Sequence, residues 1–453
     1  MRHLFVMRHA KAKQPSDNMT DYQRPLRKRG KRQATAMAPV LQRWKALEGQ
    51  VHVSTAARTR ETLDDIAAQL PERALINQPQ FDDALYTFDG EELLAWLKAL
   101  PDEPEKMLVI GHNPALVDLA CWLNKETPTS LPTGSVLHFT LPDTPWSSME
   151  PGCAELVRRL TPEEASYSLF KRLAPKPSDH KGNTSSRLLA MLEHQYRMVR
   201  ALEPGVIAGV DAEFLHQYRV NLRRSLAVGE SVRSITKVPG LKKMLKRLKY
   251  RARATSDLRD LDVFLEDIGN TSPPLSSATR QALQQWLQDC QRTEHQALCE
   301  QLSAPAYAEE MQNWQRFIAS DDVKKALTKL TPKRIKAVLN KRIASHDKDL
   351  AALSLDAPDT SLHELRKGVK RIRYLADLNP KVPKSFLAEL KHRQRLLGDF
   401  QDLCTRQAWL NAFIESADND AEQKKECASW GASLEKRKHE LRNEVLALAP
   451  LAR

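Results

Sequence analysis

The chain has 453 residues, of which 41% are hydrophobic and 28% are charged, and its formal net charge is +13. This length predicts two or three domains, and the lack of any run of about 18 apolar residues excludes membrane-spanning helices. Six scattered cysteines without CxxC spacing argue against a zinc module or a disulfide framework. Because no signal-peptide pattern opens the chain, we expect a cytoplasmic protein without a membrane partner.

The charge is distributed unevenly along the chain. Residues 1–170 carry 20 Lys+Arg and 22 Asp+Glu, whereas residues 171–453 carry 50 and 35. One part is near neutral and the other is strongly basic. This asymmetry favours a polyanion as the partner of the second part.

Short apolar runs alternate with helical patterns in the first 170 residues. The apolar runs predict three buried strands: 4–7, 51–54 and 107–111. Helical periodicity predicts three helices: 30–47, 58–70 and 91–100. Strands that alternate with helices predict a parallel α/β sheet, with a further strand pair near 135–141 and 154–160.

Cationic and imidazole side chains follow each of the three predicted strands. Arg8 and His9 come directly after the first, Arg58 follows the second after a short turn, and His112 follows the third. Because the carboxyl ends of parallel strands open onto one crevice, we expect these four side chains to converge. Arginine forks match phosphoryl oxygens, and a neutral imidazole can attack phosphorus. The pattern therefore predicts a phosphoryl-transfer site with His9 as the nucleophile.

The residues at these strand ends form recognisable motifs. They are R-H-[GA] at 8–10, S-x-x-x-R-x-x-x-T at 54–62, G-H-x-P at 111–114 and D-x-x-R-P-L-x-x-x-G at 21–30. In these motifs the sequence, over about residues 1–165, resembles the histidine phosphatase superfamily and its small SixA-like branch. The resemblance implies a three-layer α/β fold, phosphohistidine phosphatase activity without a cofactor, and His9 as nucleophile. It also implies that Arg8, Arg58 and His112 bind phosphate.

The sequence departs from larger members of that superfamily in one respect. It has no glutamate-bearing insertion between 85 and 108, and Asp82, Asp83 and Asp89 match no acid motif. A missing general acid suits a good leaving group, such as the imidazole of a phosphohistidine protein or a phosphoanhydride. A metal site built from two histidines with Asp82 or Asp83 is disfavoured because no close histidine pair exists. A cup that binds phosphate without turnover stays open as an alternative.

The composition and the hydrophobic periodicity change between the two parts of the chain. Residues 174–186 are rich in Pro, Ser, Gly and Lys and read as a linker. Beyond them the pattern is almost wholly helical. We therefore predict an α/β domain at 1–170, a linker at 171–186 and an all-α domain at 187–453.

The helical part contains an internal repeat. The pattern H-x-x-R-x-x-x-[RK]-R occurs at 216–224 and 363–371, and similar second segments occur at 258–263 and 397–402. Such repeats predict duplicated helical units that pack face to face. On a helix, each copy places its cations beside the apolar stripe rather than opposite it, which favours a lined groove. A basic row along 241–253 adds further charge that a polyanion would neutralise.

These repeats, over about residues 187–445, resemble the CHAD domain. The resemblance implies a helical bundle of two pseudo-symmetric halves that binds inorganic polyphosphate along a basic groove, which would place the protein at polyphosphate granules. It implies a groove lined by His216, Arg219, Arg223, His363, Arg366 and Lys370, with Lys246, Arg253 and Arg373 as weaker additions. Asp260 and Asp402 either orient the arginines or cap helices.

Other readings of the helical part fit less well. Nucleic acid would also give salt-dependent binding, but only 6% of the chain is aromatic, and base recognition needs stacking side chains. A protein-interaction module ranks last. We expect a phosphatase joined to a polyphosphate-binding domain. It would act either on a phosphohistidine protein or on polyphosphate or another phosphoanhydride.

Overall fold

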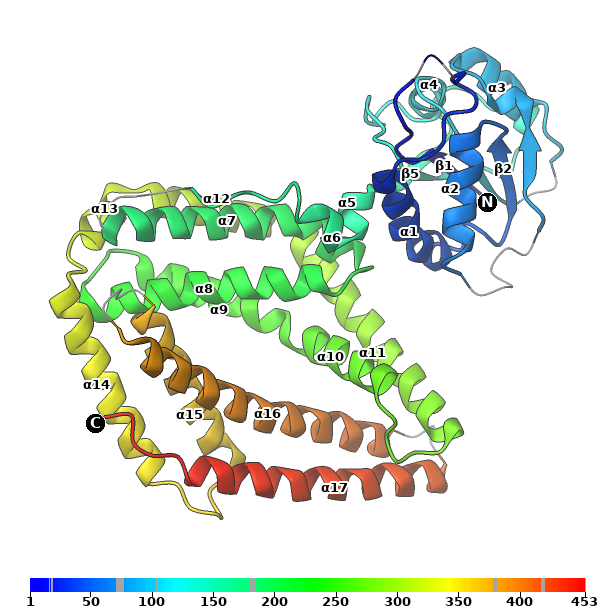
Figure 1. Cartoon of the computed structure of the whole chain (residues 1–453). Coiled ribbons are helices and arrows are strands. Elements are labelled where there is room, and N and C mark those ends of the chain that lie inside the picture. The colour runs from blue at the N-terminus through cyan, green and yellow to red at the C-terminus, as the bar shows by residue number, and fades with distance from the viewer. Residues whose placement is uncertain are drawn as a thin grey trace. The chain divides into compact units, whose positions relative to one another are not determined.

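The computed structural model describes residues 1–15, 17, 19–70, 77–102, 105–178, 184–377, 382–416 and 420–452 (Figure 1). These residues form two compact units. The first comprises Met1–Ala174 with Pro204–Phe214, and the second comprises Pro175–Glu203 with Leu215–Arg453. Part of the predicted linker, residues 179–183, lies outside the described residues, and the predicted domain boundaries stay predictions.

The first unit is built on a six-stranded sheet with the order β3-β2-β4-β1-β5-β6. Its strands are β1 (Arg2–Arg8), β2 (Gln50–Ser54), β3 (Gln80–Asp82), β4 (Lys106–Gly111), β5 (Val136–Leu141) and β6 (Glu155–Leu160). The expected strands are confirmed, and β3 was not predicted. The expected parallel pairing is confirmed for β1, β2 and β4, whereas β5 and β6, for which no direction was predicted, run antiparallel to their neighbours. Apolar patterning marks a strand but carries no information on its direction.

Helices cover both faces of this sheet, so the unit has three layers. Helices α1 (Lys28–Arg43) and α2 (Ala57–Ala67) pack against the face that carries Phe5 and Met7. Helices α3 (Gly90–Lys98) and α4 (Ala115–Leu123) pack against the opposite face, together with alternate residues of β1 and β4. The period-two alternation of a strand sends its residues to both layers. Short helical turns complete the unit: η1 (Asp83–Leu85), η2 (Trp146–Ser148), α5 (Pro162–Ala165) and α6 (Tyr167–Phe170).

The pairing of β1 with β4 brings two motif segments side by side. Their parallel register places Arg8 opposite Gly111. The backbone N–H of His9 then donates to the carbonyl oxygen of Gly111 at 3.1 Å. The segments R-H-A and G-H-N-P therefore leave the sheet together, at the edge where the second strand also ends.

The described residues of the second unit form helices joined by turns and loops, and no strand occurs among them. Its helices are α7 (Thr184–Ala208), α8 (Glu213–Ile235), α9 (Leu241–Ala254), α10 (Ser256–Asn270), α11 (Ser277–Ser303), α12 (Pro305–Ala319), α13 (Asp321–Leu327), α14 (Pro332–Ala351), α15 (Asp359–Ala376), α16 (Lys384–Glu415) and α17 (Ala421–Leu446). The end of α7 and the first residues of α8, within Pro204–Phe214, pack with the first unit. No helix in the described part of the chain is long and apolar enough to cross a bilayer.

The two repeat copies lie on α8 and α15, and their second segments lie on α10 and α16. The predicted apolar stripe of α8 is buried at Leu215, Tyr218 and Leu222, and that of α15 is buried at Leu362, Leu365 and Val369. These stripes anchor both helices in the bundle. The basic residues next to each stripe are thereby held at the border between core and solvent.

Candidate active site and candidate anion pocket

Four side chains come together at the carboxyl ends of β1, β2 and β4, and we call Arg8, His9, Arg58 and His112 the phosphate cup. The rings of His9 and His112 lie 5.2 Å apart between centroids. Arg8, His9 and Arg58 line a cavity of about 180 Å³. His112 lies behind this lining and is 1% exposed. The four side chains thus lie close together, as the sequence predicts.

His9 is held with one ring nitrogen ready to attack. Its Nδ1 lies 2.7 Å from the carbonyl oxygen of Ala10, and because a carbonyl only accepts, Nδ1 must carry the proton. The lone pair is therefore on Nε2. Burial, together with the charges of Arg58 and Arg8 and against the opposing bond to Ala10, lowers the pKa of His9 to about 3. The imidazole is thus neutral at physiological pH.

His112 has protein partners at both ring nitrogens. Arg58 Nε donates to His112 Nδ1 at 3.2 Å, so Nε2 carries the proton and donates to Ser54 Oγ at 2.8 Å. Burial, followed by the charge of Arg58, lowers the pKa of His112 to about 2. In this arrangement His112 orients Arg58. A direct contact of His112 with phosphate stays a prediction.

Arg58 is also held by a residue to which the sequence assigned no role. Asp21 accepts from Arg58 Nη2 at 2.9 Å through its carboxylate and from Nη1 at 2.6 Å through its carbonyl oxygen. The same carboxylate accepts from Arg24 and from the Tyr86 hydroxyl. Burial raises the pKa of Asp21, but the bonds from Arg24 and Tyr86 and the charge of Arg58 bring it down to about 2. Asp21 is therefore ionised and holds both terminal nitrogens of the guanidinium, while His112 accepts from its Nε.

Each fixed position of the motif S-x-x-x-R-x-x-x-T has a local task. Ser54 ends β2 and bonds His112. Arg58 and Thr62 are four residues apart and so share one face of α2. Thr62 Oγ1 donates to the carbonyl of Arg58 at 2.6 Å and accepts from the N–H of Ala10 at 3.0 Å. The motif thus ties the strand carrying His9 to the helix carrying Arg58.

Arg8 is the cation of the cup that has no counter-ion among the described residues. Its Nη1 donates to the carbonyl of Leu131 at 2.8 Å. Its Nε is buried and has no hydrogen-bond partner among the described residues. Burial and the charge of Arg58 lower the pKa of Arg8. A bound anion would supply the counter-charge that the protein does not.

The three acidic residues considered for the general acid serve the local fold. Asp82 accepts from Ala84 N and Trp96 Nε1, Asp83 accepts from Thr55 Oγ1, and Asp89 caps α3. None of the three lines the cavity. Within the described residues no group of three or more His, Cys, Asp or Glu side chains is arranged to hold a metal ion.

We expect His9 and His112 to stay unprotonated across the physiological range. Their pKa values of about 3 and about 2 lie far below the usual 6.5. The C2-proton resonances of both rings, assigned with His9→Asn and His112→Asn variants, should show no titration between pH 8 and pH 5. Since the unfolded chain binds protons there and the folded chain does not, stability should fall as pH drops below 6.5 toward 3. An inflection between pH 6 and 7 in either resonance would contradict this assignment.

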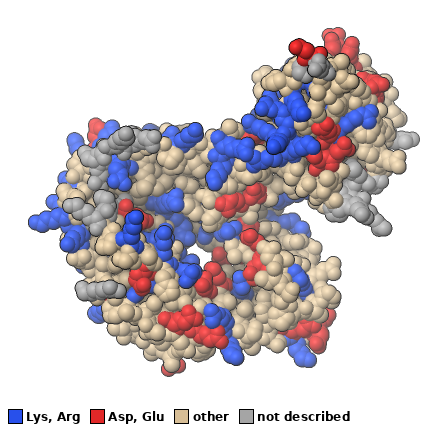
Figure 2. All heavy atoms as spheres, in the orientation of Figure 1, with Lys and Arg blue, Asp and Glu red and all other residues tan. Residues whose placement is uncertain are grey.

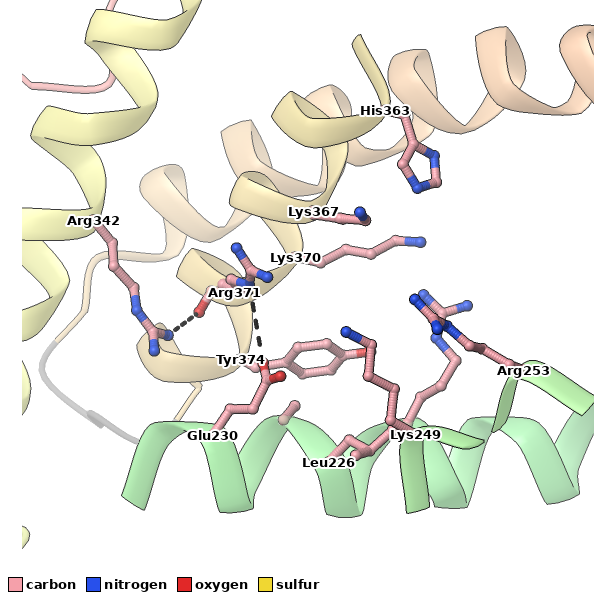
Figure 3. A pocket seen from close by; sticks show the side chains of 12 residues that line it. Leu226, Glu230, Lys249, Arg253, Arg342, His363, Lys367, Lys370, Arg371 and Tyr374 are labelled. Atoms are coloured by element: carbon pink, nitrogen blue, oxygen red, sulfur yellow. Dashed lines mark hydrogen bonds and ion pairs between the residues drawn. The ribbon is translucent and has the colours of Figure 1, made fainter. Parts of the chain in front are cut away.

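The second unit contains a basic pocket of about 330 Å³, which we call the helical pocket (Figure 3). Its walls come from α8, α9, α14 and α15, and Lys370 of α15 faces Lys249 and Arg253 of α9 across it. It is lined by Arg223, Leu226, Ala227, Glu230, Lys249, Arg253, Arg342, His363, Lys367, Lys370, Arg371 and Tyr374. Eight of the twelve are Lys, Arg or His, and Glu230 is the one carboxylate of this lining, so the pocket fits an anion.

The structure brings four of the nine predicted binding residues to this pocket: Arg223, His363, Lys370 and Arg253. Five others do not line it: His216, Arg219, Arg366, Lys246 and Arg373. A helical wheel orders residues around one axis, but whether a side chain reaches a pocket depends on the neighbouring helix. Lys246 is exposed on α9, and Arg373 stacks on Tyr374, with 5.3 Å from its guanidinium carbon to the ring centroid.

Arg219 instead ties α8 to the junction of α9 and α10. Its Nη1 donates to Thr255 Oγ1 at 2.6 Å and to the Ala252 carbonyl at 3.2 Å. Burial lowers the pKa of Arg219 to about 10. Asp260 and Asp402 lie inside α10 and α16 rather than at helix ends, so capping is excluded for both. Burial raises the pKa of each carboxyl, and the charges of Arg219 and Arg366, respectively, oppose the rise.

Lys370 is surrounded by other cations. Burial lowers its pKa to about 6, the charges of Arg223, Arg366 and Arg373 push in the same direction, and Asp402 opposes them. Arg366 Nε is buried and has no hydrogen-bond partner in the described chain. The two repeat copies thus bring Arg223 of α8 close to Arg366 and Lys370 of α15.

Sequence reasoning missed several residues at both sites. In the phosphate cup these are Asp21, Tyr86 and the role of Ser54, although the D-x-x-R-P-L motif already marked Asp21. In the helical pocket they are Lys249, Lys367, Arg371 and Arg342. Lys249 was visible in the basic row of 241–253, whereas Arg342 sits on α14, outside both repeat copies, and carried no signal.

Comparisons with known proteins give the classes of both parts of the chain. Residues 4–127 match the model of the histidine phosphatase superfamily (branch 1), and residues 190–411 match that of the CHAD domain. The first match is to a family of phosphatases. The chain carries a histidine phosphatase superfamily domain followed by a CHAD domain.

Individual relatives match one domain at a time. Uncharacterized proteins of Mycobacterium leprae and Mycobacterium tuberculosis are 29% identical over 163 and 160 residues, which is 33% of this chain and 96% of theirs. A structure of the histidine phosphatase SixA complexed with tungstate is 25% identical, with a TM-score of 0.30, over 35% of this chain and 97% of that one. The CHAD domain of the plant Ricinus communis is 22% identical, with a TM-score of 0.50, over 61% and 96%.

Proposed function

We propose that the phosphatase domain works through a phosphohistidine intermediate on His9. The observation that supports this most is the neutral imidazole of His9, whose Nε2 carries the lone pair inside a cavity lined by Arg8 and Arg58. Nε2 attacks phosphorus while the two guanidiniums stabilise the charge on the phosphoryl oxygens. Water then attacks the phosphorus, the P–N bond breaks and orthophosphate leaves.

The substrate of this domain must carry a good leaving group. The carboxylate that lines the cavity, Asp21, is ionised with a pKa of about 2 and accepts three hydrogen bonds, so it holds no proton to donate. Asp82, Asp83 and Asp89 are engaged elsewhere. Phosphohistidine on a protein and phosphoanhydrides such as polyphosphate both leave without strong acid assistance, whereas an alkyl phosphomonoester does not.

We further propose that the CHAD domain binds inorganic polyphosphate in the helical pocket. The support is the cluster of Arg223, Lys249, Arg253 and Lys370, which line one pocket. A chain of phosphates would neutralise them without needing the stacking aromatics that nucleic acid recognition requires. Tyr374 is the one aromatic residue of the lining. Polyphosphate granules would then be the cellular site of the protein.

A panel of substrates tests the phosphatase proposal. Purified full-length protein should release phosphate from phosphohistidine or from long-chain polyphosphate, and at least about 10²-fold more slowly from an alkyl phosphate, the scale of a lost general acid. Filter binding of labelled polyphosphate, repeated at rising salt, measures the second activity in the same preparation. Equal rates on all three substrates would show that a general acid is present. Absence of turnover with every substrate would leave the cup as a binding site.

A further inference from the structure

A basic ribbon borders the mouth of the phosphate cup. The backbone N–H of Lys13 donates to the carbonyl of Pro25, and that of Arg27 donates to Lys11, each at 2.9 Å. Ala12 and Leu26 form an antiparallel bridge between these hydrogen bonds. The ribbon leads directly into α1. We call Lys11, Lys13, Arg24, Arg27 and Lys28 the basic rim.

The net charge of the first domain is near zero, so it gives no indication of this local basic surface. Residues 11–32 carry eight Lys and Arg but only two Asp and Glu. Outside the rim, Arg29 pairs with Glu163 at 2.9 Å and Arg32 bonds Ser168. Lys11, Lys13, Arg27 and Lys28 are exposed, and Figure 2 shows Lys and Arg side chains gathered over the start of α1. The surface therefore offers unneutralised positive charge to a ligand.

The start of α1 is built against the usual preference of a helix. Its first turn contains no acidic residue, and Arg27 at the N-cap provides no side-chain cap. Positive charge at a helix N-terminus opposes the helix dipole, so a bound anion would relieve the conflict. Gly30 permits the helix to lie this close, because a Cβ there would sit 2.2 Å from the Lys11 carbonyl oxygen. Ribbon and helix start thus form one surface.

The rim is continuous with the catalytic cavity. Lys11 and Arg24 line the same cavity as His9, while Lys13, Arg27 and Lys28 lie beyond its lining. At about 180 Å³ the cavity is smaller than the roughly 300 Å³ at which sites begin to enclose a drug-sized ligand. A substrate whose terminal phosphoryl group reaches His9 must leave its remainder outside, and the rim provides complementary charge there.

We propose that the basic rim binds inorganic polyphosphate and guides a chain end to His9, so that this domain removes terminal phosphates from polyphosphate. This inference rests on the proposed function of the cup. A phosphate chain carries negative charge along its whole length, as the rim and the helical pocket both require. Its leaving group is itself a phosphate chain, which departs without the general acid that this site lacks.

The reaction balances without any co-reactant other than water. His9 Nε2 forms a bond to the terminal phosphorus, and the bond from that phosphorus to the bridging oxygen breaks. The shortened chain leaves with the bridging oxygen and its electron pair. Water then attacks the phosphohistidine, the P–N bond returns its electrons to Nε2, and orthophosphate and one proton are released.

The test compares a long and a short substrate on one variant. Lys13→Glu/Arg27→Glu/Lys28→Glu alters only rim residues outside the cavity lining. For long-chain polyphosphate we expect KM to rise at least about tenfold and the salt dependence to flatten. For phosphoramidate, which fits within the cavity, kcat/KM should change by less than about twofold. Lys125→Glu/Arg158→Glu/Arg159→Glu, which reverses three exposed charges outside the rim, is the matched control and should alter neither.

The experiment is repeated in a Lys370→Glu background, which removes a cation of the helical pocket. The rim effect should persist there; its disappearance would show that the second domain causes it and would overturn the inference. Turnover of phosphoramidate without turnover of polyphosphate, or an unchanged KM for polyphosphate, would also overturn it while the proposed function stands. Rim-dependent turnover of an acidic phosphohistidine protein alone would replace polyphosphate by a protein partner. If phosphoramidate, polyphosphate and the phosphohistidine protein are all left intact, the proposed function itself fails.

Discussion

Replacing His9 by asparagine should reduce kcat for phosphoramidate or polyphosphate by at least about 10³-fold, because the nucleophile is lost. Asparagine keeps a side chain that can bond within the cup but has no lone pair basic enough to attack phosphorus. Arg8 and Arg58 remain in place, so substrate should still bind. The measurement is the initial rate of phosphate release together with equilibrium binding of orthophosphate to the same variant.

A phosphoenzyme assay separates the nucleophile from a merely structural histidine. Rapid quenching with labelled phosphoramidate should trap an acid-labile, alkali-stable label on wild type and none on His9→Asn. His3→Asn is the control, since His3 bonds His138 and lies outside the cavity lining. Retained turnover in His9→Asn, or a label that survives acid, would refute the assignment of His9.

Polyphosphate binding to the helical pocket should weaken as pH rises from 6 to 8, because binding requires Lys370 to take up a proton. In the empty pocket its pKa is about 6, so it is largely neutral at pH 8. A polyanion favours the ammonium and raises this pKa in the complex. The dissociation constant should therefore increase with pH above 6, by at most about tenfold per unit, and be flat below it.

Substitutions at Lys370 give this prediction its controls. Lys370→Arg keeps the charge at every pH and should abolish the slope, whereas Lys370→Glu should weaken binding by at least about 10²-fold through repulsion. Lys249→Arg changes a lysine of the same lining and should preserve the slope. A His363→Gln background removes the imidazole that also faces the pocket. Titration calorimetry in buffers of different ionisation enthalpy measures the proton uptake that accompanies binding. If no proton is taken up at pH 7.5, the prediction for Lys370 is refuted.

Much of the catalytic cup could be predicted because strand ends are visible in a sequence. Arg8, His9, Arg58 and His112 each follow an apolar run or a short turn, and a parallel arrangement brings such ends to one edge. The direction of β5 and β6 could not be predicted, because the pattern of apolar residues indicates which residues are buried but not which way a strand runs. Asp21 was missed as a partner of Arg58 because the two residues lie 37 positions apart, with α1 and β2 between them, and no local spacing links them.

The helical pocket was only partly predictable for a different reason. A helical wheel orders residues around one axis, so it placed Arg223 and Lys370 correctly beside their apolar stripes. A wheel holds no information on the neighbouring helix. That helix decides whether a residue next to the apolar stripe lines a cavity or is covered. Arg219 is covered by the corner of α9 and α10, whereas Lys249 and Arg342 are brought in by packing.

The sequence by itself determined the two-part architecture, the helical repeat and the chemistry available at three strand ends. Each of these rests on local spacing, which a linear chain records directly. Only the tertiary structure decided the tautomers of His9 and His112, the ionised Asp21 behind Arg58 and the low pKa of Lys370. Those properties depend on which dipoles and charges surround a buried group within a few ångströms, and folding alone brings such neighbours together.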